Sequence, residues 1–190
     1  MDILDLYKRT DIKPAAGKLL IAEPFLTDPG FARTVVLLCE HGEDGSIGFV
    51  INKPSPSLIG DLLPDTEQPA LPVFEGGPVQ NNTLHMIHRI PELIGGLEVM
   101  PGIFWGGSYH EFSKLGAQTL DSRIRLFIGY SGWEQGQLEQ ELEEGAWLVA
   151  DGFSDLIFDT EPSRVWQDSI RSLGSDYAYL ANMPVHPQLN

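Results

Sequence analysis

The stretch RTVVLLCEHGEDGSIGFVINKP, residues 33–54, decides the fold that the sequence predicts. β-Branched and aliphatic residues run through 34–38, glycine and aspartate follow within 42–45, and a second apolar run returns through 47–51. Two apolar runs joined by a glycine-containing turn predict an antiparallel hairpin. The runs are nearly continuous rather than alternating, which indicates that both faces of the two strands are covered by other parts of the protein.

Further apolar runs, bounded by glycine and proline, predict more short strands on both sides of this hairpin. We expect these strands at 18–22, 71–79, 83–90, 102–107, 123–130 and 146–151. The run DLIFD at 155–159 is expected to be a strand that pairs with the last of them. Within 83–90 the apolar residues alternate, so that His85 and His88, three positions apart, should point to opposite faces.

Besides a helix after Ser131, helices are expected at four places, and in three of them a candidate capping residue precedes the helical pattern. A short helix should follow Ser57, a second should follow Ser108, and an amphipathic helix or arm should occupy residues 1–13. A last helix should begin at Thr160 or Ser163, with an inward face formed by Val165, Trp166, Ile170 and Leu173 and with Gly174 as its stop.

The segment GYSGW, residues 129–133, is one residue short of the G-x-S-x-G elbow that presents a nucleophilic serine. Trp133 occupies the place of the last glycine of that elbow. Ser131 is also followed three residues later by Glu134, which forms the S-x-x-E pattern of a capping box before Leu138 and Leu142. We therefore interpret Ser131 as a helix cap rather than as a nucleophile.

About nine short strands and four or five helices, with hairpins early in the chain, predict an α+β fold of the α/β type with a mixed sheet. The sheet should be mostly antiparallel and strongly curved, partly closing into a barrel, because that many strands in one flat sheet would leave long edges. We expect a single domain over 1–190, with an N-terminal arm or helix at 1–16, a core at 17–174 and a C-terminal tail at 175–190. The tail is expected to pack loosely.

The charge balance bears on the partners that the protein can have. Twelve Lys and Arg residues face 27 Asp and Glu residues, for a formal net charge of -15. Such a protein repels nucleic acid and anionic membranes unless basic residues are concentrated in one place. The densest basic group, Lys8, Arg9, Lys13 and Lys18, is small, so direct DNA binding is disfavoured. The start of the chain is acidic and lacks the apolar core of a signal peptide, which predicts a cytoplasmic protein.

Metal and cofactor sites are not expected. A single cysteine, Cys39, cannot build a structural zinc site, and its place in an apolar run indicates a buried thiol. His85 and His88 should diverge, and His88 is interpreted as an edge or rim residue. Four glutamates, Glu139, Glu141, Glu143 and Glu144, are interpreted as the solvated face of a helix.

The segment EGGPV, residues 75–79, follows a predicted strand and is the best candidate for an element that lines a ligand site. Adjacent glycines permit either a tight turn or the close approach of a ligand, and turn geometry alone is a sufficient explanation. The segment lacks the pattern of a phosphate-binding loop. The candidate ligand-binding residues are Asn52, Lys53, Gly76, Gly77 and Pro78, and no catalytic residues are assigned.

Three segments in this order resemble the YqgE/AlgH family of bacterial proteins: DPGFARTVVLLCEHGEDGSIGFVINKP, VFEGGPV and GYSGWEQGQLEQELEEGAWLV, followed by VWQDSIRSLG. The resemblance extends from about residue 17 to residue 174. It implies an α/β fold with mixed sheets, part of which curls toward a barrel. It also implies a link to transcriptional regulation, since one namesake is tied to the control of alginate synthesis, but it provides no catalytic residues and no cofactor.

Three functional hypotheses follow. The first is a non-enzymatic cytoplasmic regulatory or interaction protein that acts through a protein partner or a small ligand. The second is a transcriptional regulator that binds DNA directly. The third is a hydrolase-like enzyme with a site near Gly76, Gly77 and Ser131.

Overall fold

The computed structural model describes residues 10–116, 120 and 122–183. Ten strands lie in this part of the chain, β1 (Lys18–Ala22), β2 (Val35–Gly42), β3 (Gly45–Val50), β4 (Pro54–Leu58), β5 (Pro72–Glu75), β6 (Val79–His88), β7 (Leu97–Met100), β8 (Ile103–Trp105), β9 (Ile124–Trp133) and β10 (Trp147–Asp151). The helices described there are α1 (Ile59–Leu62), α2 (Pro91–Ile94), α3 (Tyr109–Phe112), α5 (Gln137–Glu143), α6 (Ser154–Phe158), α7 (Pro162–Ser172) and the 3-10 helix η2 (Leu180–Asn182).

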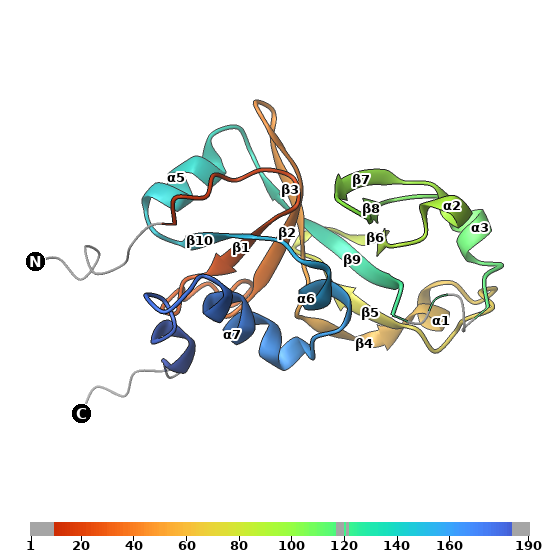
Figure 1. Cartoon of the computed structure of the whole chain (residues 1–190). Coiled ribbons are helices and arrows are strands. Elements are labelled where there is room, and N and C mark those ends of the chain that lie inside the picture. Colours follow the sequence, from red (N-terminus) through yellow and green to blue (C-terminus); the bar gives the residue numbers. More distant parts are fainter. Residues whose placement is uncertain (1–9, 117–119, 121, 184–190) are drawn as a thin grey trace, which may run out of the picture.

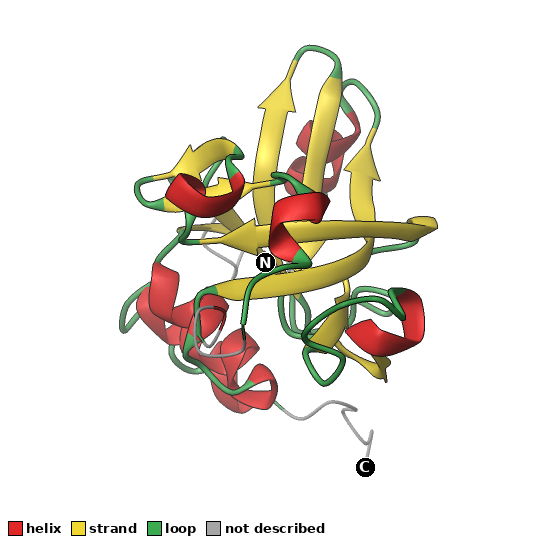
Figure 2. Ribbon diagram, turned by 90° about the vertical axis from the view of Figure 1, so that its right-hand side faces the viewer, coloured by secondary structure: helices red, strands yellow, loops and turns green. Residues whose placement is uncertain are grey.

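The strands form one strongly curved sheet in which β9 joins two halves (Figure 1). The order along the main path is β10-β1-β2-β3-β9-β6-β8-β7, and all of these neighbours are antiparallel. β5 pairs in parallel with β9 and antiparallel with β4. Figure 2 shows strands at steep angles to one another, with the helices around them. The prediction of an α+β fold with a mixed, mostly antiparallel sheet is confirmed.

The sheet curls without closing into a barrel. β7, the strand at one end of the main path, lies close to the residue that precedes β1. A Cβ atom on Gly17 would lie only 2.8 Å from the carbonyl oxygen of Val99 in β7. No strand pairing joins β7 to β1 within the described residues. The space inside the curve is filled by side chains from both halves, and α6 and α7 pack against the same cluster.

The predicted burial of both strand faces is confirmed by three apolar clusters. Along β1, Leu19 and Ile21 face the inner cluster, whereas Leu20 and Ala22 face a second cluster on the outer side of the first half. α5 contributes Leu138 to that second cluster. A third cluster covers the outer side of the other half and includes residues from α1, α2 and α3. The continuous apolar runs thus supply both faces of the sheet at once.

β9 changes the face that it presents to the inner cluster halfway along its length. Phe127 and Tyr130 both contact the inner cluster, although residues three apart in a regular strand point to opposite faces. Gly129 lies between them with a φ of 65°, a left-handed conformation that favours glycine. β9 pairs with β5 at residues 126–128 and with β6 at residues 124–128 and again at Tyr130, whereas its pairing with β3 is confined to residues 131–133. The glycine therefore redirects the strand from one half of the sheet to the other.

Several expected elements differ from the structure. Residues 155–159 do not pair as a strand, because 154–158 form α6, whose last carbonyls accept hydrogen bonds from Arg125 on β9. Ser57 lies in β4, and the first helix is preceded by Leu58, whose N–H donates to Asp61. The last helix begins after Glu161 rather than at Thr160 or Ser163, although Val165, Trp166 and Ile170 are buried as expected.

The two ends of the chain also differ from expectation. Residues 10–13 contain no helix, and residues 1–9 of the expected arm lie outside the described part. In the tail, Leu180 and Ala181 of η2 are buried and pack against the inner cluster, so the expectation of loose packing is wrong there. Residues 184–190 lie outside the described part. The predicted cap at Ser108 is confirmed, since its hydroxyl accepts the N–H of Glu111.

Candidate functional site

The predicted glycine turn lies where β3, β5 and β9 meet. The N–H of Gly76 donates to the carbonyl of Ile128 on β9, at 2.8 Å. The carbonyl of Gly76 accepts the N–H of Val50, at 2.9 Å, and also the hydroxyl of Ser131, at 3.0 Å. One peptide group thus connects the end of β3, the turn after β5 and the second part of β9.

The glycines at this junction are required by contacts between backbone segments. A Cβ atom on Gly76 would lie 2.4 Å from the carbonyl oxygen of Gly129, and one on Gly77 would lie 2.3 Å from the carbonyl oxygen of Tyr130. Carbon atoms do not approach oxygen that closely, so neither position has room for a side chain. The packing of the chain is a sufficient reason for both glycines.

Ser131 does not cap a helix, and the capping interpretation is wrong. The residue lies inside β9, fully buried, and its hydroxyl donates a hydrogen bond to Gly76 across the sheet. The helix that follows starts at Gln137 after Gly136, and the side chain of Gln137 accepts the N–H of Glu134. The S-x-x-E pattern therefore lies at the end of a strand rather than at the start of a helix. Ser131 pairs with Gly48 of β3, and β9 continues to Trp133.

Asn52 holds two strands together through its side-chain amide. Its side-chain oxygen accepts the N–H of Val35, and its side-chain nitrogen donates to the carbonyl of Arg33, each at 2.9 Å. Both polar atoms of the amide therefore have backbone partners at the start of β2. This arrangement continues the β2–β3 pairing by one more residue and is structural.

Lys53, Gly77 and Pro78 line one pocket of about 390 Å³ beside the junction. The ammonium of Lys53 lies 2.9 Å from a carboxylate oxygen of Glu75, and both side chains are about half exposed. An exposed ion pair of this kind contributes little to stability, roughly 0–1 kcal/mol, and its partners can reorient toward a ligand. The other lining residues are Gly30, Val50, Ser55, Asn81 and Ile128.

The structure brings together three of the five candidate residues and adds polar groups that the sequence analysis did not select. Gly76 is closed off by Gly129 and Phe49, and Asn52 does not line the pocket. Glu75 was within reach of sequence reasoning, because it precedes the two glycines and has the charge opposite to Lys53. Ser55 and Asn81 carry no local signal, since their positions depend on how β4 and β6 leave the junction.

The chain matches known proteins over most of its length. Residues 19–178 match the model of a family described as AlgH-like. A UPF0301 protein of Chlorobaculum tepidum is 45% identical over 94% of this chain and 96% of its own length. A UPF0301 protein of Bacteroides thetaiotaomicron is 35% identical, covering 98% and 97% of the two chains.

The chain belongs to the AlgH-like family. Solved structures agree with this assignment. The solution structure of AlgH from Pseudomonas aeruginosa has a TM-score of 0.70 and 27% identity, and the match covers 95% of this chain and 100% of that one. A crystal structure of a Corynebacterium diphtheriae protein has a TM-score of 0.73 at 23% identity over 94% and 96% of the two chains, which shows the shared fold.

Two histidines of this AlgH-like chain, His85 and His88, occupy different environments on β6. His85 and His88 point to opposite faces of β6 as predicted. His85 lies among aromatic rings, 5.1 Å from Phe49 and 5.9 Å from Tyr130 between centroids. His88 is fully buried, donates to the carbonyl of Gly106 and accepts the N–H of Ile90, so its assignment as a rim residue is wrong. Burial lowers the pKa of both histidines and keeps them neutral.

Metal-ligating groups do not converge in the described residues, where no cluster of three or more His, Cys, Asp and Glu side chains is placed to hold an ion. Cys39 is buried as predicted, and burial raises the pKa of its thiol far above the usual range. A thiol in this state is a poor nucleophile and a poor metal ligand.

Of the four glutamates in and directly after α5, one is not part of a solvated face. A carboxylate oxygen of Glu141 accepts the indole N–H of Trp133, at 2.9 Å, and that of Trp147, at 2.7 Å. Phe31 packs against both indole rings. Glu141 thus attaches α5 to β9 and β10, whereas Glu139, Glu143 and Glu144 are exposed as predicted.

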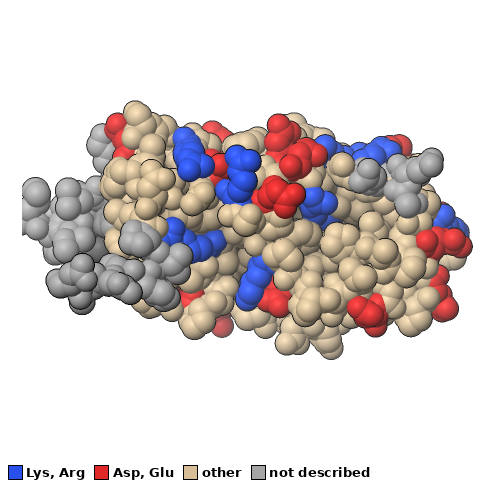
Figure 3. All heavy atoms as spheres, turned by 90° about the horizontal axis from the view of Figure 1, so that it is seen from below, with Lys and Arg blue, Asp and Glu red and all other residues tan. Residues whose placement is uncertain are grey.

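Three arginines on the side formed by α6 and α7 are paired with acidic residues. Arg89 lies 2.8 Å from Asp159, and Arg164 and Arg171 both contact Asp168. Figure 3 views the molecule from this side, the lower side of Figure 1, and shows blue and red side chains interspersed rather than a continuous basic area. Among the described residues on this face, the extended basic surface that nucleic acid requires is absent.

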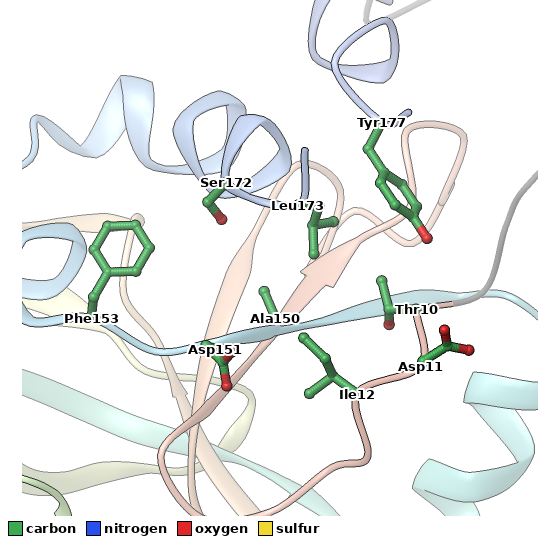
Figure 4. Close-up of a pocket in the computed structure, with 9 residues that line it drawn as sticks. All are labelled: Thr10, Asp11, Ile12, Ala150, Asp151, Phe153, Ser172, Leu173 and Tyr177. Atoms are coloured by element: carbon green, nitrogen blue, oxygen red, sulfur yellow. The ribbon is translucent and has the colours of Figure 1, made fainter. Parts of the chain in front are cut away.

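A second pocket of about 390 Å³ lies beside β10, the strand at the free edge of the sheet (Figure 4). Residues 10–12 form one wall, and Leu173 and Tyr177 at the end of α7 form another. The hydroxyl of Thr10 accepts the N–H of Val149, one of the groups that β10 directs outward. The segment before β1 therefore covers part of this edge, which limits pairing with another strand.

None of the helices in the described part of the chain has the length and apolar character needed to cross a membrane.

Proposed function

We propose that the protein is a non-enzymatic cytoplasmic interaction protein with a regulatory role, and that a small polar ligand binds in the pocket beside Lys53. The observation that carries the proposal is the position of this pocket. Charged and polar groups from Lys53, Glu75 and Asn81 surround it, directly beside the junction at which three strands are fixed. Preformed pockets with a few convergent polar groups are typical of small-molecule sites.

Because the pocket adjoins this junction, ligand binding at Lys53 would alter the contacts among β3, β5 and β9 and in this way act as a regulatory signal. Val50 and Gly77 line the pocket, and the carbonyl between Gly76 and Gly77 is bonded to β3 and β9. A ligand that displaces Glu75 from Lys53 would act on a turn that both halves of the sheet share. Binding energy in this place can therefore change the stability of the junction as a whole.

A thermal-shift screen of phosphorylated and carboxylated metabolites tests this proposal. The wild type is compared with Lys53→Met, which removes the charge inside the pocket, and with Lys114→Met. Lys114 forms a similar exposed ion pair with Glu111 next to α3 and serves as the matched control. We expect at least one compound to stabilise the wild type and Lys114→Met but not Lys53→Met. Compounds that stabilise all three proteins equally, or none that stabilise the wild type, would contradict the proposal.

The alternative functions have weaker support. The hydroxyl of Ser131 is fully buried and bonded to the carbonyl of Gly76, which argues against a hydrolase. The net charge of -15 and the paired arginines argue against direct DNA binding. A gel shift that persists at physiological salt, or hydrolysis that Ser131→Ala abolishes, would favour these alternatives instead.

A further inference from the structure

A groove of about 550 Å³ is lined by residues from the tip of the β2–β3 hairpin, the end of β9 and the start of α5. Figure 1 shows where these elements lie. Strand register explains its position. Glu40, Ile47 and Gly132 are direct cross-strand neighbours on β2, β3 and β9, and Val79 is the neighbour of Tyr130. The groove is lined by Glu40, Asp44, Gly45, Ser46, Ile47, Val79, Tyr130, Gly132, Trp133, Glu134 and Gln137.

The floor of the groove is apolar and partly aromatic. Ile47, Val79 and Tyr130 are each partly exposed there. Gly132 has no side chain, and a Cβ atom on it would lie 3.2 Å from a ring carbon of Tyr130. The ring of Tyr130 thus packs over Gly132 and remains partly exposed, and the face of an aromatic ring attracts cations.

The rim of the groove is acidic and lacks counter-charges. Glu40, Asp44 and Glu134 stand at its edge, and no Lys or Arg is among its lining residues. None of these three carboxylates forms an ion pair with any other residue that the structure describes. The nearest histidine on the hairpin, His41, faces Glu139 at 3.7 Å instead. Like charges held around one groove favour a cationic occupant.

We propose that this groove binds an extended basic segment of a partner protein, in which arginine or lysine alternates with apolar residues. Basic side chains would meet the carboxylates of the rim, and apolar side chains would cover the floor. A second copy of this chain is disfavoured as the occupant, because two chains of net charge -15 repel each other. The site is separate from the Lys53 pocket, and the proposal does not depend on a ligand there.

Fluorescence anisotropy with a defined probe tests the groove. The probe is a fluorescein-labelled peptide of alternating arginine and leucine, and the comparison peptide has glutamate in place of each arginine. In the groove variant Glu40→Gln, Asp44→Asn and Glu134→Gln, the carboxylates are replaced by amides of the same shape. We expect the arginine peptide to bind the wild type, the glutamate peptide not to bind, and the groove variant to bind the arginine peptide at least about tenfold more weakly.

A matched variant separates the groove from the overall charge. Asp65→Asn, Glu67→Gln and Glu161→Gln remove three exposed carboxylates that do not line the groove, and binding should weaken by less than about twofold at moderate salt. Lys53→Met should bind like the wild type, which separates this result from the proposed ligand pocket. Thermal unfolding confirms that each variant is folded. Equal weakening in both triple variants, absence of binding to the wild type, or a dimer that only the groove variant dissociates would each overturn the proposal.

Discussion

Two junctions hold the second part of β9, and they differ in the atoms that make contact. At the glycine junction, formed by Gly76, Gly77 and Gly129, backbone lies directly on backbone. At the tryptophan junction, side chains from β9 and β10 donate to the carboxylate of Glu141 on α5. The glycine junction has no room for an added side-chain atom, whereas the tryptophan junction depends on one hydrogen-bond acceptor, the carboxylate of Glu141. The second part of β9 is therefore held by close packing of backbone on backbone as well as by hydrogen bonds.

The largest expected effect is at the glycine junction, in Gly77→Ala. The added Cβ would meet backbone atoms of Tyr130 and Ser131 at 2.3–2.4 Å, and Gly77 has a φ of 153°. Overpacking and an unfavourable backbone conformation each cost roughly 1–3 kcal/mol, so we expect a loss of about 2–5 kcal/mol in the free energy of unfolding. Chemical denaturation with urea measures this loss.

Gly102→Ala is the matched control for backbone conformation without a clash. Gly102 has a φ of 77°, but nothing lies within 4 Å of the position of its Cβ. We expect this substitution to cost only about 1–2 kcal/mol, the penalty for a left-handed residue. Equal losses in Gly77→Ala and Gly102→Ala would show that close packing at the glycine junction is unimportant.

At the tryptophan junction, Glu141→Ala should cost about 2–4 kcal/mol, because two partly buried indole N–H groups lose their acceptor. Glu144→Ala, at an exposed position on the same helix, should change stability by less than about 0.5 kcal/mol. Urea denaturation followed by tryptophan fluorescence measures both. A red shift of the native emission in Glu141→Ala alone would place the change at Trp133 and Trp147, and no difference between the variants would refute this account.

A smaller effect is expected for Ser131→Ala, which removes one of the two hydrogen bonds to the carbonyl of Gly76. The bond from Val50 remains, so the carbonyl keeps a partner and the loss should be about 1 kcal/mol. Ligand binding at the Lys53 pocket should be unchanged in calorimetric titrations with any compound found by the screen. A loss comparable to that of Gly77→Ala would mean that the hydroxyl, rather than the glycines, fixes the junction.

The smallest expected effect is a dependence on pH that originates next to the glycine junction, where His85 contacts Tyr130. Burial lowers the pKa of His85 in the folded protein, so the unfolded chain takes up the proton first as the pH falls. Stability should therefore be complete above about pH 6.5 and should decrease as the pH falls toward the pKa of the folded state. His85→Gln should reduce this decrease in urea titrations, and an unchanged pH profile would exclude His85 as its source.

Local patterns in the sequence predicted those elements whose side chains alternate or follow a helical period. In the runs at 18–22 and 35–38, successive side chains pack alternately into two apolar clusters on opposite faces of the sheet. The apolar face of α7 is buried as its helical period predicted. The cap predicted at Ser108 is confirmed and the one predicted at Ser131 is wrong, although both serines are followed by a glutamate three residues later. The difference is that β3 pairs with β9 at Ser131, a contact between residues more than eighty positions apart.

The candidate site was only partly predictable for the same reason. Adjacent glycines in the EGGPV segment indicated a close approach, but the sequence does not reveal whether a ligand or the chain itself makes that approach. The partner of Gly77 is the backbone at Tyr130, which no local pattern identifies. Similarly, the short apolar run at 154–158 is compatible with a strand or a helix, and long-range hydrogen bonds from Arg125 accompany the helical form.

The path of β9 has a consequence for how the molecule opens. Because one continuous strand pairs with β5 and β6 through residues 124–130 and with β3 at residues 131–133, neither half of the sheet can separate without breaking a ladder that belongs to both. Amide hydrogens on either side of residue 129 should then exchange with solvent deuterium at similar, slow rates that report global unfolding. A chain that looks like two sheets joined end to end would melt as a single cooperative unit.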